Sequence, residues 1–216
     1  NFWREWERPV HIEFYEPSGA LGFRADGGVR IFGHWSAAAP FKPLALYARQ
    51  QYGEGKFHYQ IFPDKPIFDF ETFMLRNSGN DWNRTLFRDA VIHAVASEIG
   101  LPTQAYRPAL LFLNGRYWGI HNLRERVNEH YLASNYHINP DSVDLVAYNY
   151  GFVVYAGDSL NYAALRNFVQ KHDLTQADNY HIVTQWIDIE NFIDYFIIEI
   201  YFANRDWPHN NQHMWR

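Results

Sequence analysis

The chain has 216 residues, 47% of them hydrophobic and 19% aromatic, and a formal net charge of −5 from 19 basic and 24 acidic residues. This composition excludes a disordered protein and allows one large domain or two small ones with a substantial core. Charges of both signs are scattered along the sequence, which argues against the basic stripe of a nucleic-acid-binding protein. Because there is no Cys, disulfides and thiolate metal sites are excluded.

The sequence contains no run of about 18 apolar residues that would indicate a membrane span, and no signal peptide. Its most apolar stretch, 192–203, is interrupted by Asp194 and Glu199. The chain starts abruptly in polar aromatic sequence at Asn1 and stops at Trp215-Arg216, so we expect it to be cut from a longer protein.

The first half of the chain is predicted to be rich in β-strands. Residues 10–15 alternate between apolar and polar side chains and lie between two prolines. Further short strands are expected at 29–32, directly after Gly27-Gly28, at 44–48 and at 73–76. A helix is predicted over 85–99, because apolar residues recur there at helical spacing before Gly100 and Pro102.

The clearest predicted element is a β-hairpin. Strand-like runs at 109–113 and 117–123 flank Asn114-Gly115, and both of these residues tolerate the positive φ of a type I′ turn. A helix over 127–135 and a strand over 143–148, extended over 152–156, are expected to follow.

The second half is predicted to be mainly helical. Helices are expected over 159–172, with Asp158 or Ser159 as the N-cap, over 176–185, and over 189–203 as a long, mostly buried helix. Strands, a hairpin and then helices make an α+β order, with a β-rich part at about 9–125 and a mainly helical part at about 126–216.

The last predicted helix is followed by the polar segment Asn204-Arg205-Asp206-Trp207-Pro208-His209-Asn210-Asn211. Pro208 predicts a loop, because proline disfavours a continuing helix. Protein-kinase catalytic loops use an Asp and an Asn five positions apart, as at Asp206 and Asn211, to orient the attacking hydroxyl and to bind magnesium. Both residue types are also common in turns, so this match alone is weak.

Three upstream segments strengthen the match. They are Gly28-Val29-Arg30-Ile31-Phe32-Gly33-His34-Trp35-Ser36, Leu75-Arg76-Asn77-Ser78-Gly79-Asn80-Asp81-Trp82 with Phe87-Arg88-Asp89 after it, and Leu113-Asn114-Gly115-Arg116-Tyr117-Trp118-Gly119-Ile120-His121-Asn122-Leu123-Arg124-Glu125. In this order they resemble the CotH kinase family, the spore-coat protein H type of atypical secreted bacterial kinases. The resemblance spans about residues 28–216, and the Asn-Gly-x-Tyr-x-Gly core with its trailing Leu-x-Glu is its most specific part.

The resemblance implies a single kinase-like, two-lobed domain over 1–216 that is incomplete at its C-terminus. It implies transfer of the γ-phosphoryl of ATP to a protein Ser or Thr hydroxyl with Mg²⁺ as cofactor, so a nucleotide and a protein substrate are the expected partners. It also implies an exported, extracellular or cell-surface location. In the family a second metal-binding Asp follows the Asn-bearing segment, and because this chain ends before it, we expect the chain alone to be nearly inactive.

By the same resemblance, Arg30, Gly33, Ser36 and Lys42 are expected to form a phosphate-binding loop with its anchoring lysine. The alternative is a glycine turn with two solvated cations. The chain departs from the family pattern after the Ser, where 37–39 are all Ala instead of starting with a basic residue, and after the Lys, where Pro stands.

The second segment holds a dense polar cluster of Arg76, Asn77, Asn80, Asp81, Arg88 and Asp89. One interpretation is nucleotide or cleft binding, with Arg76 as a cofactor-binding residue. The other, which we favour for the cluster as a whole, is a buried scaffold in which Arg88 and Asp89 tie the strand end to the helix start and Asp81 caps the helix.

Glu125 is expected by resemblance to pair with Lys42 and to hold it extended, as a Glu does in kinase-like sites. The alternative is an exposed strand-end carboxylate between Arg124 and Arg126. Three positions later the family tends to carry an Asp, and Asn128 stands there instead.

Asp206 is the first candidate for the catalytic or metal-proximal carboxylate and Asn211 for the magnesium ligand, with Asn210 as the alternative. His209 and His213 are spaced i, i+4, but no second carboxylate follows them in a zinc-type pattern.

A non-catalytic surface module that binds a partner or a glycan on the same fold is the rival function. Trp35, Trp82, Trp118 and Trp207 suit stacking on sugars as well as they suit a nucleotide cleft. A hydrolase with paired carboxylates has no nucleophile or zinc pattern to support it.

Overall fold

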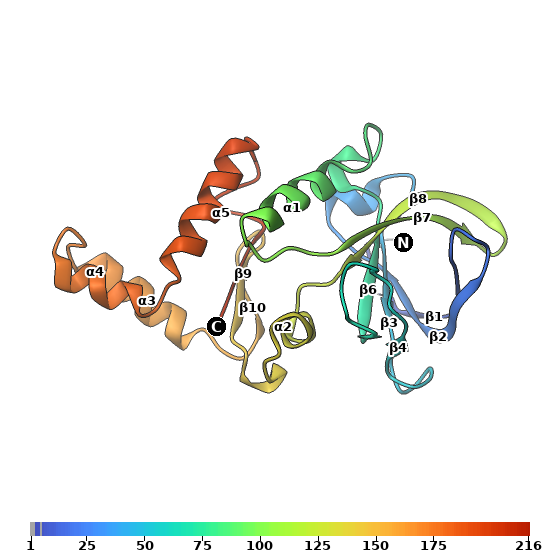
Figure 1. The fold of residues 1–216 in the computed structure, drawn as a ribbon, viewed down its shortest axis with the longest axis horizontal. Helices are drawn as coiled ribbons and strands as arrows, with labels where there is room; N and C mark the ends of the chain where they lie inside the picture. The colour runs from blue at the N-terminus through green and yellow to red at the C-terminus, as the bar shows by residue number, and fades with distance from the viewer. Residues whose placement is uncertain (1–2, 5) are drawn as a thin grey trace. The chain divides into compact units, whose positions relative to one another are not determined.

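A computed structural model describes residues 3–4 and 6–216 as a mixed α+β structure, with a β-rich N-terminal part and helices mostly in the C-terminal part (Figure 1). The α+β prediction is thereby confirmed. The chain divides into two compact units. Unit 1 comprises Asn1–His93 and Gln104–Val127, and unit 2 comprises Ala94–Thr103 and Asn128–Arg216.

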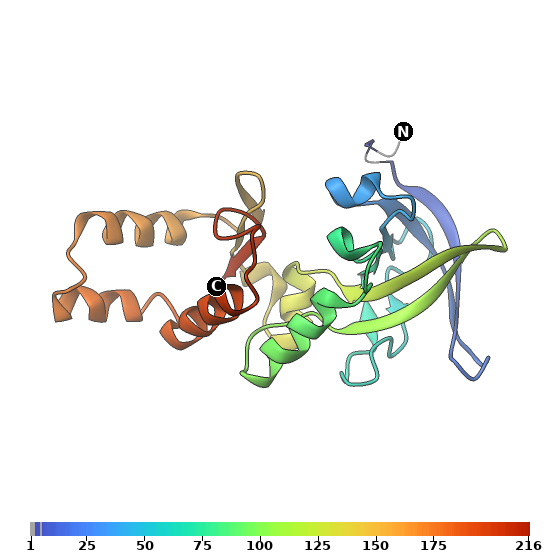
Figure 2. The ribbon, with the colours of Figure 1, turned by 90° about the horizontal axis from the view of Figure 1, so that it is seen from above.

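Unit 1 is built on a curved six-stranded antiparallel sheet that forms a half-barrel, in the order β1-β2-β3-β6-β8-β7 (Figure 2). Its strands are β1 Arg8–Tyr15, β2 Leu21–Ile31, β3 Leu44–Tyr47, β6 Thr72–Arg76, β7 Tyr106–Leu113 and β8 Arg116–Glu125. A short ribbon of β4 Phe57–His58 and β5 Asp69–Phe70 and two 3₁₀ turns, η1 Trp35–Ala38 and η2 Gly79–Asp81, complete it, and helix α1 Arg88–Glu98 begins in this unit.

The core of unit 1 is mainly aromatic and aliphatic, which fits the high aromatic share of the sequence. Its buried members are Phe23, Leu44, Leu46, Phe57, Ile61, Phe62, Phe70, Phe73, Leu75 and Leu123. Phe57 packs against Phe73 with ring centroids 5.2 Å apart in an edge-on arrangement that aromatic pairs favour.

Strand β2 is longer than the sequence predicted, because Gly27 and Gly28 lie inside it and do not form a turn before it. A Cβ on Gly27 would lie 2.9 Å from the backbone oxygen of Tyr47 and 3.2 Å from the ring of Phe57. Glycine is therefore required here because β2 approaches neighbouring strands closely, which a sequence pattern cannot distinguish from a turn.

The predicted hairpin is confirmed. Asn114 and Gly115 connect β7 to β8 with φ values of +50° and +76°, as a type I′ turn requires. Helix α1 begins at Arg88 and not at the predicted 85, since Leu86 has a φ of +67°, outside the helical region.

Unit 2 contains a three-stranded antiparallel sheet in the order β10-β9-β11, and most of the helices. The strands are β9 Leu145–Tyr148, β10 Phe152–Ala156 and β11 Gln212–Trp215, and the helices are α2 Glu129–Tyr136, α3 Leu160–Lys171, α4 Ala177–Thr184 and α5 Ile189–Tyr201, with a 3₁₀ turn η3 Pro140–Ser142. Strand β11 was not predicted, and β10 is a separate strand paired with β9.

Side-chain caps fix several helix starts of unit 2. Asn128 accepts a hydrogen bond from the Tyr131 amide at 2.9 Å, so an Asp or an Asn serves equally at this position of the family pattern. At α3 the Leu160 amide donates to Asp158 at 2.8 Å, while Ser159 makes no side-chain cap.

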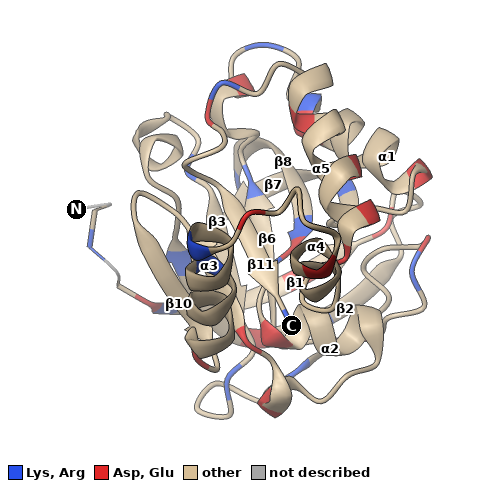
Figure 3. Ribbon diagram, turned by 90° about the vertical axis from the view of Figure 1, so that its left-hand side faces the viewer, with Lys and Arg blue, Asp and Glu red and all other residues tan. Residues whose placement is uncertain are grey.

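Helix α5 is not mostly buried as predicted, because Ile198 is its only buried residue in the structure. Its exposed large apolar side chains are Phe192, Ile193, Ile197, Ile200 and Tyr201. Within the described residues no helix has the length and apolar character needed to span a membrane. Lys and Arg, in blue, and Asp and Glu, in red, are scattered over the ribbon in Figure 3, in keeping with the scattered charges of the sequence.

We predict that Gly27→Ala lowers the free energy of unfolding by about 1–3 kcal/mol, because the added methyl group must displace backbone. Gly53→Ala is the matched control, since its Cβ would meet only the Asp26 oxygen at an ordinary 3.5 Å. Urea unfolding of both variants measures the difference, and equal effects would contradict the packing argument.

Candidate active site

The C-terminal half of β8 is a continuous buried segment in which four of five residues are polar. These residues are His121, Asn122, Leu123, Arg124 and Glu125, none of them more than 3% exposed. Buried polar groups need partners, and each of these side chains reaches a different segment of unit 1. The candidate site is therefore organised from β8 outward.

The predicted phosphate loop follows β2. Gly33 has a φ of +87°, and a Cβ at this position would lie 2.2 Å from the hydroxyl oxygen of Ser36. Only glycine therefore allows Ser36 to fold back over the loop. The loop returns to β3 with Phe32 N donating to Pro43 O at 3.2 Å, so Arg30, Gly33, Ser36 and Lys42 lie on one turn of chain.

The side chains of Asn77 and His121 contact the backbone of this loop. The Asn77 amide donates to the backbone oxygens of Ser36 and Phe41 at 3.1 and 2.7 Å. The ring nitrogen Nε2 of His121 lies 3.0 Å from the Lys42 backbone oxygen, and burial lowers the pKa of this His, which keeps the ring neutral. The backbone of the loop is thus fixed at Ser36, Phe41 and Lys42.

The alanines that replace a basic residue after Ser36 have a structural reason. Ala37 is 1% exposed and Ala39 is also buried, so both pack into unit 1 and a long cation would not fit at either position. Pro43 is fully buried as well.

The polar cluster after β6 forms the expected scaffold at Asp81. Its carboxylate accepts hydrogen bonds from the Thr85 and Arg88 amides at 3.3 and 3.2 Å, and Arg88 pairs with it at 3.3 Å. Burial alone would raise the pKa of Asp81, but the hydrogen bonds from Thr85 and from the Arg88 amide lower it overall. Asp81 is therefore occupied in fixing the start of α1.

Arg76 ties the end of β6 to α1 through Asp89, with 3.4 Å between Nε and Oδ2. Arg124 shares this carboxylate at 4.0 Å and is fully buried. Within the described part of the chain, neither the Arg124 guanidinium nor the Asp89 carboxylate makes a hydrogen bond. Two arginines therefore share one carboxylate, which leaves an excess of positive charge beside the second candidate segment.

This positive charge also acts on His93 in α1. Burial, together with the nearby charge of Arg124, lowers the pKa of His93 to about 3. The neutral ring accepts a hydrogen bond from the Gln104 amide at 3.2 Å, which connects α1 to the segment that enters β7.

Glu125 pairs with Lys65, and this corrects the expected pairing with Lys42. Lys65 Nζ lies 2.6 Å from Glu125 Oε2, which also accepts from the Ala105 amide at 2.7 Å. Across the sheet Glu125 lies level with Phe73 and Leu46, so Lys42 is displaced from it by four residues, about 13 Å along the strands. The interpretation of Glu125 as an exposed strand-end carboxylate is also wrong, since it is buried.

Sequence reasoning missed Lys65 because nothing local identifies it. It lies in the irregular loop between β4 and β5, sixty positions before its partner. The usable signal was indirect, because a carboxylate that becomes buried at the end of a strand needs a counter-charge from another part of the chain.

In unit 2 the structure brings Asp206 and Asn211 together on the loop between α5 and β11. The Asn211 amide donates to Asp206 Oδ2 at 2.6 Å and the Asn210 amide to Oδ1 at 3.0 Å. Asn210 is buried, and its own oxygen accepts from the Tyr150 amide at 2.9 Å. Asn210 thus anchors the loop to the β9–β10 turn, whereas Asp206 and Asn211 are exposed.

Asp206 and Asn211 have the donor chemistry that Mg²⁺ prefers. A carboxylate and an amide oxygen are hard ligands, and Mg²⁺ commonly takes one or two protein oxygens and completes its shell with water and phosphate. A half-turn of the Asn211 amide exchanges its nitrogen for its oxygen beside Asp206. Among residues 3–4 and 6–216, no group of three or more His, Cys, Asp or Glu forms a metal site.

The family model for CotH kinase protein matches residues 29–216 of this sequence. The chain belongs to this family. Among curated protein sequences, none matches the chain. The expectation drawn from the three upstream segments and the Asp206 loop is thereby confirmed, and membership in a CotH kinase family makes a phosphotransferase activity the first function to consider.

Of the four tryptophans considered for stacking, Trp35 is exposed on η1, whereas Trp82, Trp118 and Trp207 are half-buried. Trp207 packs edge-on against Phe196 at 4.8 Å within unit 2. Three of these four tryptophans are therefore partly covered by the rest of their own unit.

We predict that Lys65→Ala lowers the free energy of unfolding by about 2–4 kcal/mol, because it leaves the Glu125 carboxylate buried without its cation. Lys56→Ala is the control, since this exposed lysine makes only loose pairs at 3.6 and 4.0 Å and should cost less than about 1 kcal/mol. Denaturant unfolding measures both.

The double variant Lys65→Ala/Glu125→Gln should recover part of the lost stability, since it removes the unpaired charge. A double variant that unfolds as easily as Lys65→Ala would contradict the ion-pair explanation.

Proposed function

We propose that this chain is the core of an atypical protein kinase that transfers the γ-phosphoryl of ATP to a protein Ser or Thr hydroxyl. The observation that carries the proposal is the Asp206–Asn211 pair, a carboxylate and a carboxamide in contact on an exposed loop of a CotH-family chain. Phosphoryl transfer requires mainly positioning and charge stabilisation from the protein, and these two groups supply its recurring polar components.

The Gly33 loop is proposed to bind the phosphates. Its backbone is fixed by Asn77 and His121, and the Ala37 and Ala39 amides donate within the loop, so the Ser36 hydroxyl and the remaining loop amides are proposed to face an anion at little cost in ordering. Arg30 and Lys42 add cations at the two ends of the loop. Arg76, with the excess positive charge around Asp89, is proposed as a further phosphate contact.

Glu125 is proposed to be a positioning residue. It holds the β4–β5 loop through Lys65 and the start of β7 through the Ala105 amide, so its effect on catalysis is indirect. The pairing of a lysine with a buried glutamate is the kind of contact that kinase-like sites use, here made by Lys65.

Asp206 is proposed to orient the acceptor hydroxyl, and Asp206 with Asn211 to hold Mg²⁺. A bound Mg²⁺ would neutralise charge on the phosphate oxygens. The Asp206 backbone amide donates to Asn204 Oδ1, and the Asn210 amide donates to the Asp206 carboxylate and keeps it in one orientation. An exported, cell-surface location, as the family resemblance implies, is part of the proposal.

We predict that Mg²⁺-ATP raises the melting temperature of this chain. At a ligand concentration a hundredfold above Kd, binding should raise the free energy of unfolding by about 2.7 kcal/mol. Lys42→Ala and Asp206→Ala should each abolish most of the shift while the unliganded proteins melt near the parent temperature. Differential scanning calorimetry with and without Mg²⁺-ATP makes the measurement.

Lys56→Ala and Asp178→Asn change two exposed residues outside the Gly33 and Asp206 loops, so both variants serve as controls and should keep the full shift in melting temperature. No shift in the parent chain at millimolar Mg²⁺-ATP, or a shift that survives both loop variants, would contradict the proposal.

A further inference from the structure

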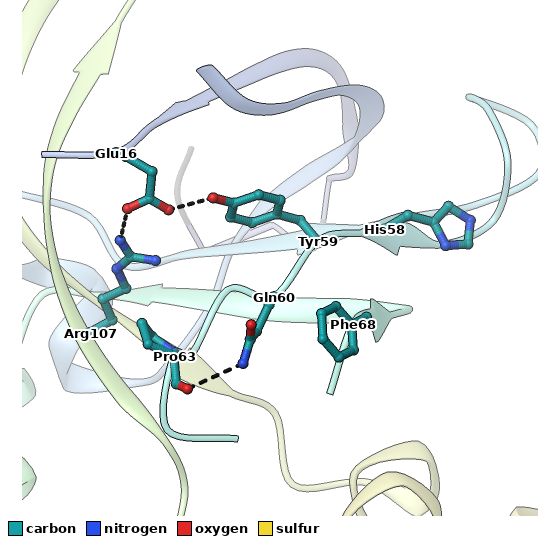
Figure 4. A pocket seen from close by; sticks show the side chains of 7 residues that line it. All are labelled: Glu16, His58, Tyr59, Gln60, Pro63, Phe68 and Arg107. Carbon is teal, nitrogen blue, oxygen red and sulfur yellow. Dashed lines mark hydrogen bonds and ion pairs between the residues drawn. The ribbon is translucent and has the colours of Figure 1, made fainter. Parts of the chain in front are cut away.

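A second candidate site lies in unit 1 away from the Gly33 loop. It is a hollow of about 540 Å³, within the size range of small-molecule sites, between the β1–β2 turn, the β4–β5 loop and β7 (Figure 4). Its lining residues are Glu16, His58, Tyr59, Gln60, Pro63, Phe68 and Arg107. Glu16 precedes β2 and Gly33 follows it, so the eleven residues of β2 separate the two sites by roughly 35 Å.

The carboxylate of Glu16 is held in one orientation at the hollow. The Tyr59 hydroxyl donates to Oε1 at 2.5 Å, and Arg107 Nη2 donates to Oε2. These two bonds, that from Arg107 first, lower the pKa of Glu16, and the hydrogen bond to Glu16 raises the pKa of Tyr59. The group at neutral pH is therefore a fixed carboxylate with a protonated phenol and a guanidinium, and its ion pair has no net charge.

Both the Nη1 group and the planar face of Arg107 make contacts within the protein. Its Nη1 donates to the Ile61 backbone oxygen at 2.9 Å, and its guanidinium stacks over the Phe14 ring at 5.0 Å. An anionic ligand such as a phosphate would have to break the pair with Glu16, so it is not favoured here.

The side-chain amide nitrogen of Gln60 is hydrogen-bonded within the protein, whereas its oxygen is available to accept a hydrogen bond from a ligand. The nitrogen donates to the backbone oxygens of Pro63 and Lys65 at 3.2 and 3.1 Å. Figure 4 shows the amide nitrogen directed toward Pro63 and the amide oxygen turned away from it. Phe68 is 56% exposed, so it offers an apolar ring face at the hollow.

These features select the chemistry of a ligand. The Tyr59 hydroxyl and the Gln60 nitrogen already donate within the protein, and Arg107 uses Nη1 and Nη2 in the same way. The Gln60 oxygen and the remaining lone pairs of Glu16 can accept further bonds, and the remaining N–H groups of Arg107 can donate. A ligand rich in hydroxyls, which both donate and accept, and with an apolar face fits these groups beside an exposed ring.

We propose that this hollow binds a neutral saccharide unit of one or two rings, with hydroxyls on Glu16 and Gln60 and an apolar sugar face on Phe68. The site does not depend on the phosphate-transfer residues. A kinase core with such a site would be held at a glycan-bearing surface or at a glycosylated substrate.

Saturation-transfer NMR on the intact chain tests the proposal with glucose, galactose, mannose, N-acetylglucosamine and N-acetylgalactosamine and their common disaccharides at millimolar concentration. At least one of them should receive saturation from the protein, and titration should show that Phe68→Ala weakens its binding by about tenfold. Phe68→Tyr, which keeps an aromatic face, should bind like the parent.

Phe112→Ala is the matched control, because Phe112 on β7 is 57% exposed but lies outside the hollow. It should leave saccharide binding unchanged. The proposal is overturned if none of these sugars receives saturation, or if the signal persists in Phe68→Ala. A saccharide signal with no ATP-induced stabilisation would support the hollow and reject only the kinase proposal.

Discussion

The buried polar segment of β8, residues 121–125, is the constraint on which the rest of unit 1 depends. Its side chains reach the Lys42 backbone, the Ser78 and Leu86 turn, Asp89 at the start of α1, and Lys65 in the β4–β5 loop. Burying four polar groups in a strand costs free energy unless each finds its partner. The fold of these loops is therefore specified by hydrogen-bonding needs as much as by the apolar core.

This arrangement links stability to the proposed function. The loop that carries Gly33 is anchored by the buried Ala37 and Ala39, and its backbone oxygens are fixed by Asn77 and His121. A loop ordered in advance loses little entropy when it binds an anion, so β8 and its neighbours prepare the site before a ligand arrives. The Asp206 loop of unit 2 uses the same principle, with Asn210 buried so that Asp206 and Asn211 can remain exposed.

What could be predicted from the sequence was local. The Asn114-Gly115 hairpin follows from the positive φ that both residues adopt, and the contact of Asp206 with Asn211 spans only five positions. The Lys65–Glu125 pair joins residues sixty positions apart through a loop without periodicity, so resemblance assigned the wrong lysine. Gly27 and Gly28 were placed before a strand that starts at residue 29, whereas they lie inside β2, because a sequence does not show where two strands approach closely.

Amide hydrogen exchange of Asn122→Ala tests most directly whether β8 holds the surrounding loops. Asn122 donates to Ser78 Oγ at 2.8 Å and to the Leu86 backbone oxygen at 2.7 Å, so its removal should speed exchange in residues 77–88. Residues 145–156 of unit 2 should exchange as in the parent chain. Unchanged exchange over 77–88, or equal acceleration in both segments, would contradict the account.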